Sequence, residues 1–284
     1  SVEPEDKWYE RGLTRWVSSI RDMVNGTITQ IKLRGYSQAE WDLIKNRVMT
    51  FEKDSFLKWV IEIMADYQRE LHNLGRVDFD DLIVLAYRLL LEDKDLRENM
   101  QQRWAYVFED EAQDSTPLQE KILKLLSEKS GNLLRVGDCN QGIMGFSGTD
   151  SSLFARFCNE ELRQPIYVAS RSTQEIMDFA NHYVNWVRNA FPLGECRGAL
   201  EDQMIYGTPA GDPFPNPITA GYGISIQEVE GDIYSELREV AAQAAAAVKS
   251  SPGKTIAILV RENRFAEQLQ TLLASYEAEW EDVS

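Results

Sequence analysis

The sequence is poor in the residues that support several common kinds of site. Its 284 residues include only two histidines, and the three cysteines, Cys139, Cys158 and Cys196, lie far apart. This odd, dispersed set fits neither a disulfide framework nor a zinc site, and it favours a reducing compartment. No apolar run approaches the roughly 18 residues of a membrane span, and no signal-peptide pattern opens the chain. We therefore expect a cytoplasmic protein without membrane attachment.

Positive charge is also scarce. The chain has 30 lysines and arginines against 46 acidic residues, a net charge of −16 at pH 7. Because nucleic acid is bound by positive surfaces, this balance predicts weak DNA binding by the chain alone, although a narrow basic groove on an acidic body remains compatible with it. The length suits roughly two domains. The start at Ser1 rather than methionine favours an excised piece of a longer protein.

The most informative stretch lies in the middle of the chain. An apolar run, 104–108, breaks into the acidic string 109–111, and Thr116, Pro117 and Gln119 then form the signature of a capped helix start. An apolar run that ends in carboxylates is typical of a parallel strand whose carboxyl end opens into a ligand crevice. The acids are either solvated residues at a strand end or ligands of a nucleotide-bound Mg²⁺ ion.

The string Asp110-Glu111-Ala112-Gln113-Asp114 favours the second interpretation. It resembles motif II of the superfamily 1 DNA helicases of the UvrD, Rep and PcrA kind. The resemblance implies ATP and Mg²⁺ as cofactors. Asp110 would hold the Mg²⁺ ion, Glu111 would take a proton from the attacking water, and Gln113 would contact the γ-phosphate.

A glycine-rich loop, 137–150, follows a second predicted strand. The loop resembles motif III of the same family, which implies that Gln141 senses the γ-phosphate and that Phe146 stacks on a base of single-stranded DNA. Met144 stands where the family usually has tyrosine, and Ser147 where it usually has arginine. We expect Phe146 and Met144 to be the nucleic-acid contacts of this loop. The two departures favour its ATP-sensing role over its DNA-binding role.

Arg171 precedes a predicted helix in which Ser172 and Glu175 form a capping box. An arginine just before a helix N-terminus is electrostatically unfavourable unless an anion joins it. The run 171–173, Arg-Ser-Thr, resembles part of motif IV of the family. The resemblance implies that Arg171 binds the nucleotide as an arginine finger, which stabilises charge on the transferred phosphoryl group. The two preceding residues, alanine and serine, replace the asparagine and tyrosine usual in that motif.

Periodicity predicts the remaining elements. Residues 1–75 are predicted to be mostly helical, with breaks at Asn25-Gly26 and Arg34-Gly35. The acidic string 78–82 leads into a further helix and resembles the segment before motif II in the family. The other predicted elements are helices at 82–91, 152–162, 235–248 and around 265–273, strands at 133–136, 166–168, 224–229 and 256–261, and a loop at 189–222.

The resemblance implies an α/β fold made of partial RecA-like parallel-sheet domains with an N-terminal helical insertion. Residues 1–77 would be the insertion, and residues 78–164 the C-terminal part of the first RecA-like domain, with motifs II and III. Residues 165–284 would be the N-terminal part of the second RecA-like domain, with motif IV.

A phosphate-binding loop (Walker A motif) ahead of motif II is missing from the sequence. Gly253-Lys254-Thr255 lies after motif II, has Val248 at the first glycine position and precedes a predicted strand, so we interpret it as a turn. The C-terminal motifs of the family are absent as well. The resemblance therefore implies an internal fragment of an ATP-dependent DNA helicase, inactive by itself. The parent would act on single-stranded DNA or DNA junctions, with DNA repair as the expected context.

Two alternatives remain open. One is a catalytically degenerate helicase-like scaffold or DNA-binding subunit, which the departures in motifs III and IV favour and the intact motif II opposes. The other is an unrelated Mg²⁺-dependent phosphohydrolase that uses the same carboxylates, which predicts hydrolysis by this chain without DNA.

Overall fold

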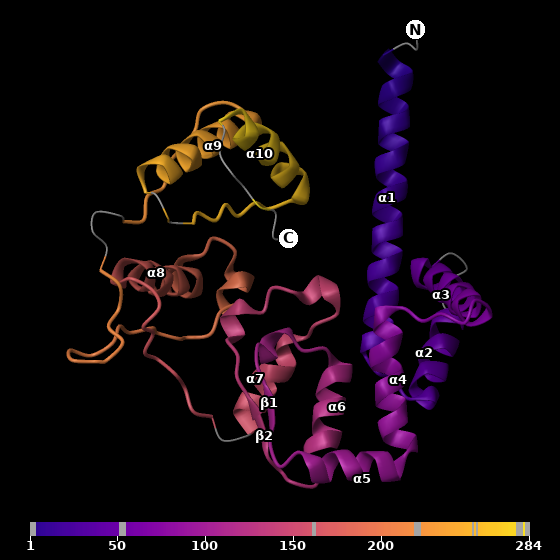
Figure 1. Ribbon diagram of the computed structural model, residues 1–284. Coiled ribbons are helices and arrows are strands. Elements are labelled where there is room, and N and C mark those ends of the chain that lie inside the picture. The colour runs from indigo at the N-terminus through magenta and orange to yellow at the C-terminus, as the bar shows by residue number, and fades with distance from the viewer. Residues whose placement is uncertain are drawn as a thin grey trace. The chain divides into compact units, whose positions relative to one another are not determined.

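The computed structural model describes residues 4–50, 55–160, 163–218, 223–251, 253, 255–276 and 281. Over these residues the chain is a helix-rich α/β protein with one small sheet of two parallel strands. It divides into two units, Ser1–Pro217 and Ile218–Ser284. Figure 1 shows the elements in chain order, from α1 in indigo to α10 in yellow.

Three helices open the first unit: α1 (Pro4–Leu33), α2 (Gln38–Thr50) and α3 (Phe56–Asn73). A buried cluster of Val24 and Ile28 from α1 and Val60 from α3 holds two of these helices together. The partly buried side chains packed against this cluster come from the same two helices, at helical spacing: Ile20, Ile31, Phe56 and Met64. The helical prediction for this region is confirmed.

The two breaks predicted in this region have opposite outcomes. The break at Asn25-Gly26 is wrong, because α1 runs through both residues. A glycine inside a helix costs about 1 kcal/mol relative to alanine, but Val24 and Ile28 on either side are buried against α3, and this packing outweighs the local preference. The break at Arg34-Gly35 is confirmed. Gly35 has φ 61°, and a Cβ atom there would lie 2.7 Å from the Leu118 side chain.

Helix α4 (Phe79–Glu92) and helix α5 (Lys94–Arg103) follow. The predicted acidic start of α4 is confirmed: the Asp78 side chain accepts a hydrogen bond from the Asp81 N–H, and the Asp81 carboxylate accepts one from the Asp78 N–H. The same two carboxylates pair with Lys32 of α1 at 2.5 and 2.9 Å. This contact fastens α4 along the C-terminal half of α1 (Figure 1).

The sheet consists of β1 (Val107–Glu109) and β2 (Leu133–Arg135), which are parallel and pair residue by residue. Helix α6 (Pro117–Ser127) connects them, and its predicted capping box is confirmed: the Thr116 side chain accepts from the Gln119 N–H, and the Gln119 side chain from the Thr116 N–H. The strand predicted at 104–108 is shorter and displaced toward the acids, because only 107–109 finds a partner in β2.

The rest of the first unit contains short turns and two longer helices. The 3₁₀ turns are η1 (Ala112–Asp114), η2 (Cys139–Gln141), η3 (Gly145–Ser147) and η4 (Gly194–Gly198), and the helices are α7 (Ser151–Glu160) and α8 (Gln174–Ala190). The helix predicted at 152–162 is confirmed as far as Glu160, and its last two residues lie outside the described part. The capping box predicted at Ser172 is wrong, because Thr173 is the N-cap residue and its side chain makes no capping bond.

In the second unit, α9 (Ile233–Ser250) packs on α10 (Asn263–Ser275) around buried Leu237, Ala241 and Leu269. Both helices confirm the prediction. The strands predicted at 166–168, 224–229 and 256–261 are wrong: within the described residues the first makes a single bridge, from Val168 to Tyr206, and the other two make none. Residues 256–261 keep the alternation of a strand, since Ile258 and Val260 pack on the helices while Leu259 is 94% exposed. Among the described residues no neighbouring strand pairs with them, and a strand exists only by such pairing.

Gly253 is the turn that the sequence predicts before this segment, with φ 81°. Lys254 lies outside the described residues. A phosphate-binding lysine stands in a turn that leads from a strand into a helix, and no helix begins at the described residues next to Gly253.

Candidate functional site

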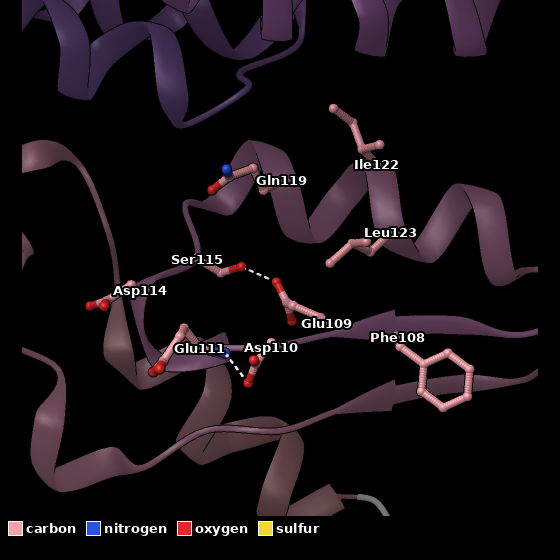
Figure 2. A pocket seen from close by; sticks show the side chains of 9 residues that line it. All are labelled: Phe108, Glu109, Asp110, Glu111, Asp114, Ser115, Gln119, Ile122 and Leu123. Atoms are coloured by element: carbon pink, nitrogen blue, oxygen red, sulfur yellow. Dashed lines mark hydrogen bonds between the residues drawn. The ribbon is translucent and has the colours of Figure 1, made fainter.

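An open pocket of about 400 Å³ lies at the carboxyl end of β1, between that strand and α6. Figure 2 shows the carboxyl groups of Asp110 and Glu111 at the point where the strand ends. The lining is acidic at this end and apolar along the helix: Phe108, Glu109, Asp110, Glu111, Asp114, Ser115, Gln119, Ile122 and Leu123. The sequence-predicted strand, acids and helix therefore form one site.

The turn after β1 is strained at Glu111. Its backbone is left-handed, with φ 51° and ψ 42°, and it is the only non-glycine residue with positive φ in the described part of the chain. Such a conformation costs about 1–2 kcal/mol for an ordinary residue. Asp110 supports the turn, because its carboxylate accepts a hydrogen bond of 3.0 Å from the Glu111 N–H. The result is that two adjacent carboxylates are both exposed at the end of one strand.

Gln113 lies behind these carboxylates and is 1% exposed. Its Nε2 donates to Glu111 Oε2 at 2.6 Å, and its Oε1 accepts from the Asp138 N–H at 3.0 Å. The room for this amide depends on Gly137, where a Cβ atom would lie 2.5 Å from the Gln113 oxygen. Gln113 thus links the catalytic candidate Glu111 to the loop after β2. Its predicted contact with a γ-phosphate stays a prediction, and these two bonds use one of its two amide N–H donors and one lone pair of its oxygen.

Asp114 is a pocket residue whose role the sequence reasoning missed. Its Oδ1 is buried without a hydrogen-bond partner among the described residues, and it lines the same pocket as Asp110 and Glu111. No group of three or more histidine, cysteine or acidic side chains in the described ranges is arranged to enclose a metal ion. Mg²⁺ commonly keeps several waters and takes one or two carboxylates. The exposed carboxylates of Asp110 and Glu111 fit a hydrated Mg²⁺ ion of this kind.

A buried ion pair between Arg135 and Glu109 supports the pocket. The Arg135 side chain is fully buried, and its Nε donates to Glu109, which also accepts a hydrogen bond from Ser115. The guanidinium lies over two rings of α7, with its central carbon 5.9 Å from the centre of the Phe154 ring and 5.1 Å from that of Phe157. The pair joins neighbouring positions of β1 and β2, so it fixes the direction in which β1 enters the acidic turn. An arginine inside an apolar strand was the sequence signal for it.

The loop after β2 carries Gln141, which is exposed and donates from Nε2 to Asp138 Oδ2 at 2.8 Å. Asp138 also donates its N–H to Gln113, so Gln141 is connected to the acidic turn through one intermediate residue. Burial, helped by the nearby Glu201 carboxylate, raises the pKa of the Cys139 thiol in this loop to about 12. The thiol is therefore protonated and weakly nucleophilic at neutral pH.

The predicted nucleic-acid residues lie farther along this loop. Phe146 is 72% exposed and Met144 is 37% exposed, and neither lines the pocket at β1. The turn that follows them is held by Gly148, whose φ is 88° and whose Cβ position would be 3.3 Å from Leu33 of α1. A free aromatic face of this kind is available for stacking on a base.

Arg34 and Gly35, the two residues that follow α1, contact α6 and the end of the loop after β2. The Gly35 carbonyl accepts a hydrogen bond of 2.6 Å from Lys121 of α6, and Arg34 pairs with Asp150 at 3.1 Å. A hydrogen bond from Ser152, together with the Arg34 charge, holds the pKa of the Asp150 carboxyl below its usual range. The N-terminal helical region is thereby connected to α6 and to the end of the loop after β2.

Arg171 is exposed, and it makes no hydrogen bond or ion pair with any other described residue in the structure. It does not line the pocket at β1. The structure thus brings Asp110, Glu111, Gln113 and Gln141 into one bonded group through Asp138, and it leaves Arg171 outside that group.

Ligand sites in open α/β sheets lie outside the carboxyl ends of parallel strands, and the pocket described above is of this class. Residues 9–161 match the family described as the UvrD/REP helicase N-terminal domain, and the chain belongs to this family. The resemblance to UvrD, Rep and PcrA helicases that the motifs predict is confirmed. Of the described helices, none is both long enough and apolar enough to cross a membrane.

Individual relatives agree with the family. The chain is 35% identical over 153 residues to the ATP-dependent DNA helicase PcrA of Leuconostoc citreum, with 52% of this chain and 20% of the relative covered. It is 34% identical over 142 residues to the putative ATP-dependent DNA helicase YjcD of Bacillus subtilis, with 49% and 19% covered. A longer alignment, with 78% and 20% covered, joins it at 27% identity to the exonuclease/helicase protein RexA of Lactococcus lactis subsp. cremoris. The chain spans about a fifth of the length of these relatives.

Proposed function

We propose that this chain is part of an ATP-dependent DNA helicase in which ATP hydrolysis drives movement along single-stranded DNA. The observation that carries the proposal is the strained acidic turn at the end of β1, in which Gln113 joins the Glu111 carboxylate to the loop after β2. This turn occurs in a chain of the UvrD/REP family whose relatives are named ATP-dependent DNA helicases.

The side chains of the turn divide the chemistry between them. Asp110 would hold Mg²⁺ through water, with Asp114 as a further carboxylate of the same pocket. The ion supplies positive charge next to the phosphates. Glu111 is exposed and takes a proton from the attacking water, while the Gln113 bond at 2.6 Å fixes the direction of its carboxylate.

Gln141 and Arg171 complete the proposed nucleotide site. Gln141 lies next to the acidic turn through Asp138, which suits a residue that senses the γ-phosphate. Arg171 is an exposed cation with no partner in the described chain, which suits an arginine finger that meets its anion only when nucleotide is bound. ATP and Mg²⁺ are the proposed cofactors of the complete protein.

The domain organisation follows the family. We assign residues 1–77 to a helical insertion, residues 78–164 to the end of a first RecA-like domain, and residues 165–284 to the start of a second. Single-stranded DNA or a DNA junction is the proposed partner, with Phe146 and Met144 as base contacts. Because the net charge is −16, the complete protein must supply most of the positive surface that holds the DNA backbone. A cytoplasmic role in DNA repair suits this activity.

Measurement of ATP hydrolysis tests the proposal. The 284-residue chain should show no turnover with or without single-stranded DNA, since its sequence holds no phosphate-binding loop ahead of the acidic turn. An extended form, defined as this chain joined to the phosphate-binding segment and the C-terminal motifs of a parent helicase, should hydrolyse ATP in the presence of DNA. In that form Glu111→Gln should lower turnover about 100-fold or more, the usual contribution of a general base.

Other outcomes point elsewhere. Turnover by the 284-residue chain that Glu111→Gln abolishes would identify a self-sufficient Mg²⁺-dependent phosphohydrolase. An extended form that binds DNA without any turnover would identify a degenerate scaffold or DNA-binding subunit. Either result overturns the proposed function.

A further inference from the structure

An extended segment, residues 199–217, crosses from the Gln141 loop to the Arg171 loop, and we call it the strap. At its start, Asn140 binds the Glu201 backbone in both directions: Glu201 N–H donates to Asn140 Oδ1 at 2.7 Å, and Asn140 Nδ2 donates to the Glu201 carbonyl at 3.2 Å. In the middle, Asn181 of α8 makes the same pair of bonds with Ile205, at 2.9 and 2.8 Å. The strap is therefore held by side-chain amides at these two points, in addition to the single bridge between Tyr206 and Val168.

Asn216 holds the other end of the strap, and both polar atoms of its side chain make hydrogen bonds. Its Nδ2 donates to the carbonyl of Ala169 at 2.5 Å and to that of Ser172 at 2.9 Å. Its Oδ1 accepts from the N–H and the hydroxyl of Thr208 at 2.6 and 2.8 Å. The two carbonyls that it binds lie on either side of Arg171, so this one amide fixes the backbone before and after that residue.

The Arg171 loop has few other restraints. The Ala169 N–H donates to the Tyr206 carbonyl of the strap at 2.9 Å. At the other side, α8 begins without a side-chain capping bond from Thr173. The Arg171 side chain is exposed and has no described partner. The strap thus fixes the backbone from which the Arg171 side chain projects.

We infer that Asn216 is a positioning residue for Arg171, acting through the strap whose other end is fastened beside Gln141. This inference rests on the proposed role of Arg171 at the nucleotide. An arginine finger contributes only when it is held in the geometry that stabilises transferred charge. Asn216 orders the backbone around Arg171, and Asn140 joins the same segment to the loop that carries Gln141.

Limited trypsin digestion of the 284-residue chain tests the positioning without any enzymatic activity. Asn216→Asp is nearly isosteric and keeps the acceptor for Thr208, but it removes both donors to the Arg171 loop and places a carboxylate against two carbonyls. Cleavage after Arg171 should become about tenfold faster, which is equivalent to about 1.4 kcal/mol. The matched control is Asn189→Asp, because in the described chain the Asn189 side chain bonds to Asn185 within α8 and not to the Arg171 loop, and it should leave cleavage unchanged.

Two further measurements distinguish a local loosening of the Arg171 loop from general unfolding. They are the rate of cleavage at sites within the helices and the midpoint of thermal unfolding. The expected result is faster cleavage after Arg171 with other sites unchanged. Equal rates of Arg171 cleavage in the wild-type chain and Asn216→Asp would overturn the positioning by the strap, and so would equal acceleration at every site.

A double-mutant cycle, measured by the kinetics of the extended form, then tests the consequence for ATP hydrolysis. Asn216→Asp should lower kcat about tenfold with KM for ATP unchanged, and it should add no loss to Arg171→Ala, since both act through one guanidinium group. Additive losses would overturn the positioning role. Full turnover by Arg171→Ala alone would instead overturn the proposed function of Arg171, while the trypsin result still reports on the strap independently.

Discussion

Replacement of Lys32 with methionine should destabilise the first unit by about 3–5 kcal/mol, the usual effect of removing one partner from a buried ion pair. The Lys32 side chain is 4% exposed, and its Nζ lies 2.5 Å from Asp78 and 2.9 Å from Asp81. The hydroxyl of Tyr67 also donates to Asp78, at 2.9 Å. Without the lysine, the two largely buried carboxylates at the start of α4 repel each other, and the ion pairs that join α1 to α4 are lost.

Urea unfolding followed by tryptophan fluorescence measures the effect. All tryptophans except Trp280 precede Ile218, so the signal reports on the first unit. A loss of this size is a large part of the roughly 5–15 kcal/mol that stabilises a typical domain. Lys129→Met is the matched control: Lys129 is exposed, so its replacement should change stability by no more than about 0.5 kcal/mol.

A triple variant separates the ion pair from simple loss of packing. Asp78→Asn and Asp81→Asn, combined with Lys32→Met, remove all the charges, and asparagine at position 78 still serves as an N-cap residue. This variant should be more stable than Lys32→Met alone, because no buried charge remains without a partner. A loss below about 1 kcal/mol for Lys32→Met, or a triple variant less stable than the single one, would refute the reasoning.

Four further outcomes are expected. Burial lowers the pKa of Lys32, but the hydrogen bonds to its two carboxylate partners outweigh this effect and raise the pKa above 10.5. The stabilisation by Lys32 is therefore complete below about that pH and is lost as the pH rises through the folded-state pKa. Thermal unfolding across alkaline pH should show this loss in the wild-type chain and not in Lys32→Met. Arg135→Met should lower unfolding free energy by about 3 kcal/mol, because Glu109 then stays buried without its partner, and a loss below about 1 kcal/mol in urea would contradict this. Gln113→Leu in the extended form should reduce kcat by about tenfold or more, as the loss of one charged hydrogen bond predicts, whereas an unchanged kcat would exclude a positioning role. Iodoacetamide should modify Cys139 far more slowly in the native chain than in urea, since its pKa is raised to about 12; equal rates by mass spectrometry would contradict that burial.

Local sequence determines those parts of the site that neighbouring residues build by themselves. The capping box of Thr116 and Gln119, the acidic start of α4 and the turn at Gly35 depend on contacts within a few residues, and each is present as predicted. The placement of Asp110 and Glu111 at a strand end also follows from the abrupt change from apolar to acidic residues. Short-range chemistry suffices for the two helix starts and the turn, whereas the strand also needs its pairing with β2.

Predictions that needed a distant partner were less successful. The helix break at Gly26 is overridden by packing on α3, and the segment 256–261 has the alternation of a strand without a neighbour to pair with. Nothing near Gln113 in the sequence shows that its amide is occupied by Asp138, 25 residues away. Local propensity is weak compared with burial, so these outcomes depend on the whole fold.

The sequence alone thus determined the family, through the motif around Glu111. The tertiary structure decided which side chains hold the candidate site residues in place: Gln113 bonds to Glu111, Arg135 pairs with Glu109, and Asn216 binds the backbone on either side of Arg171. The physical reason is the difference in range. A motif is read within a few neighbouring residues, whereas a buried charge or amide is stable only when the fold brings its partner from elsewhere in the chain.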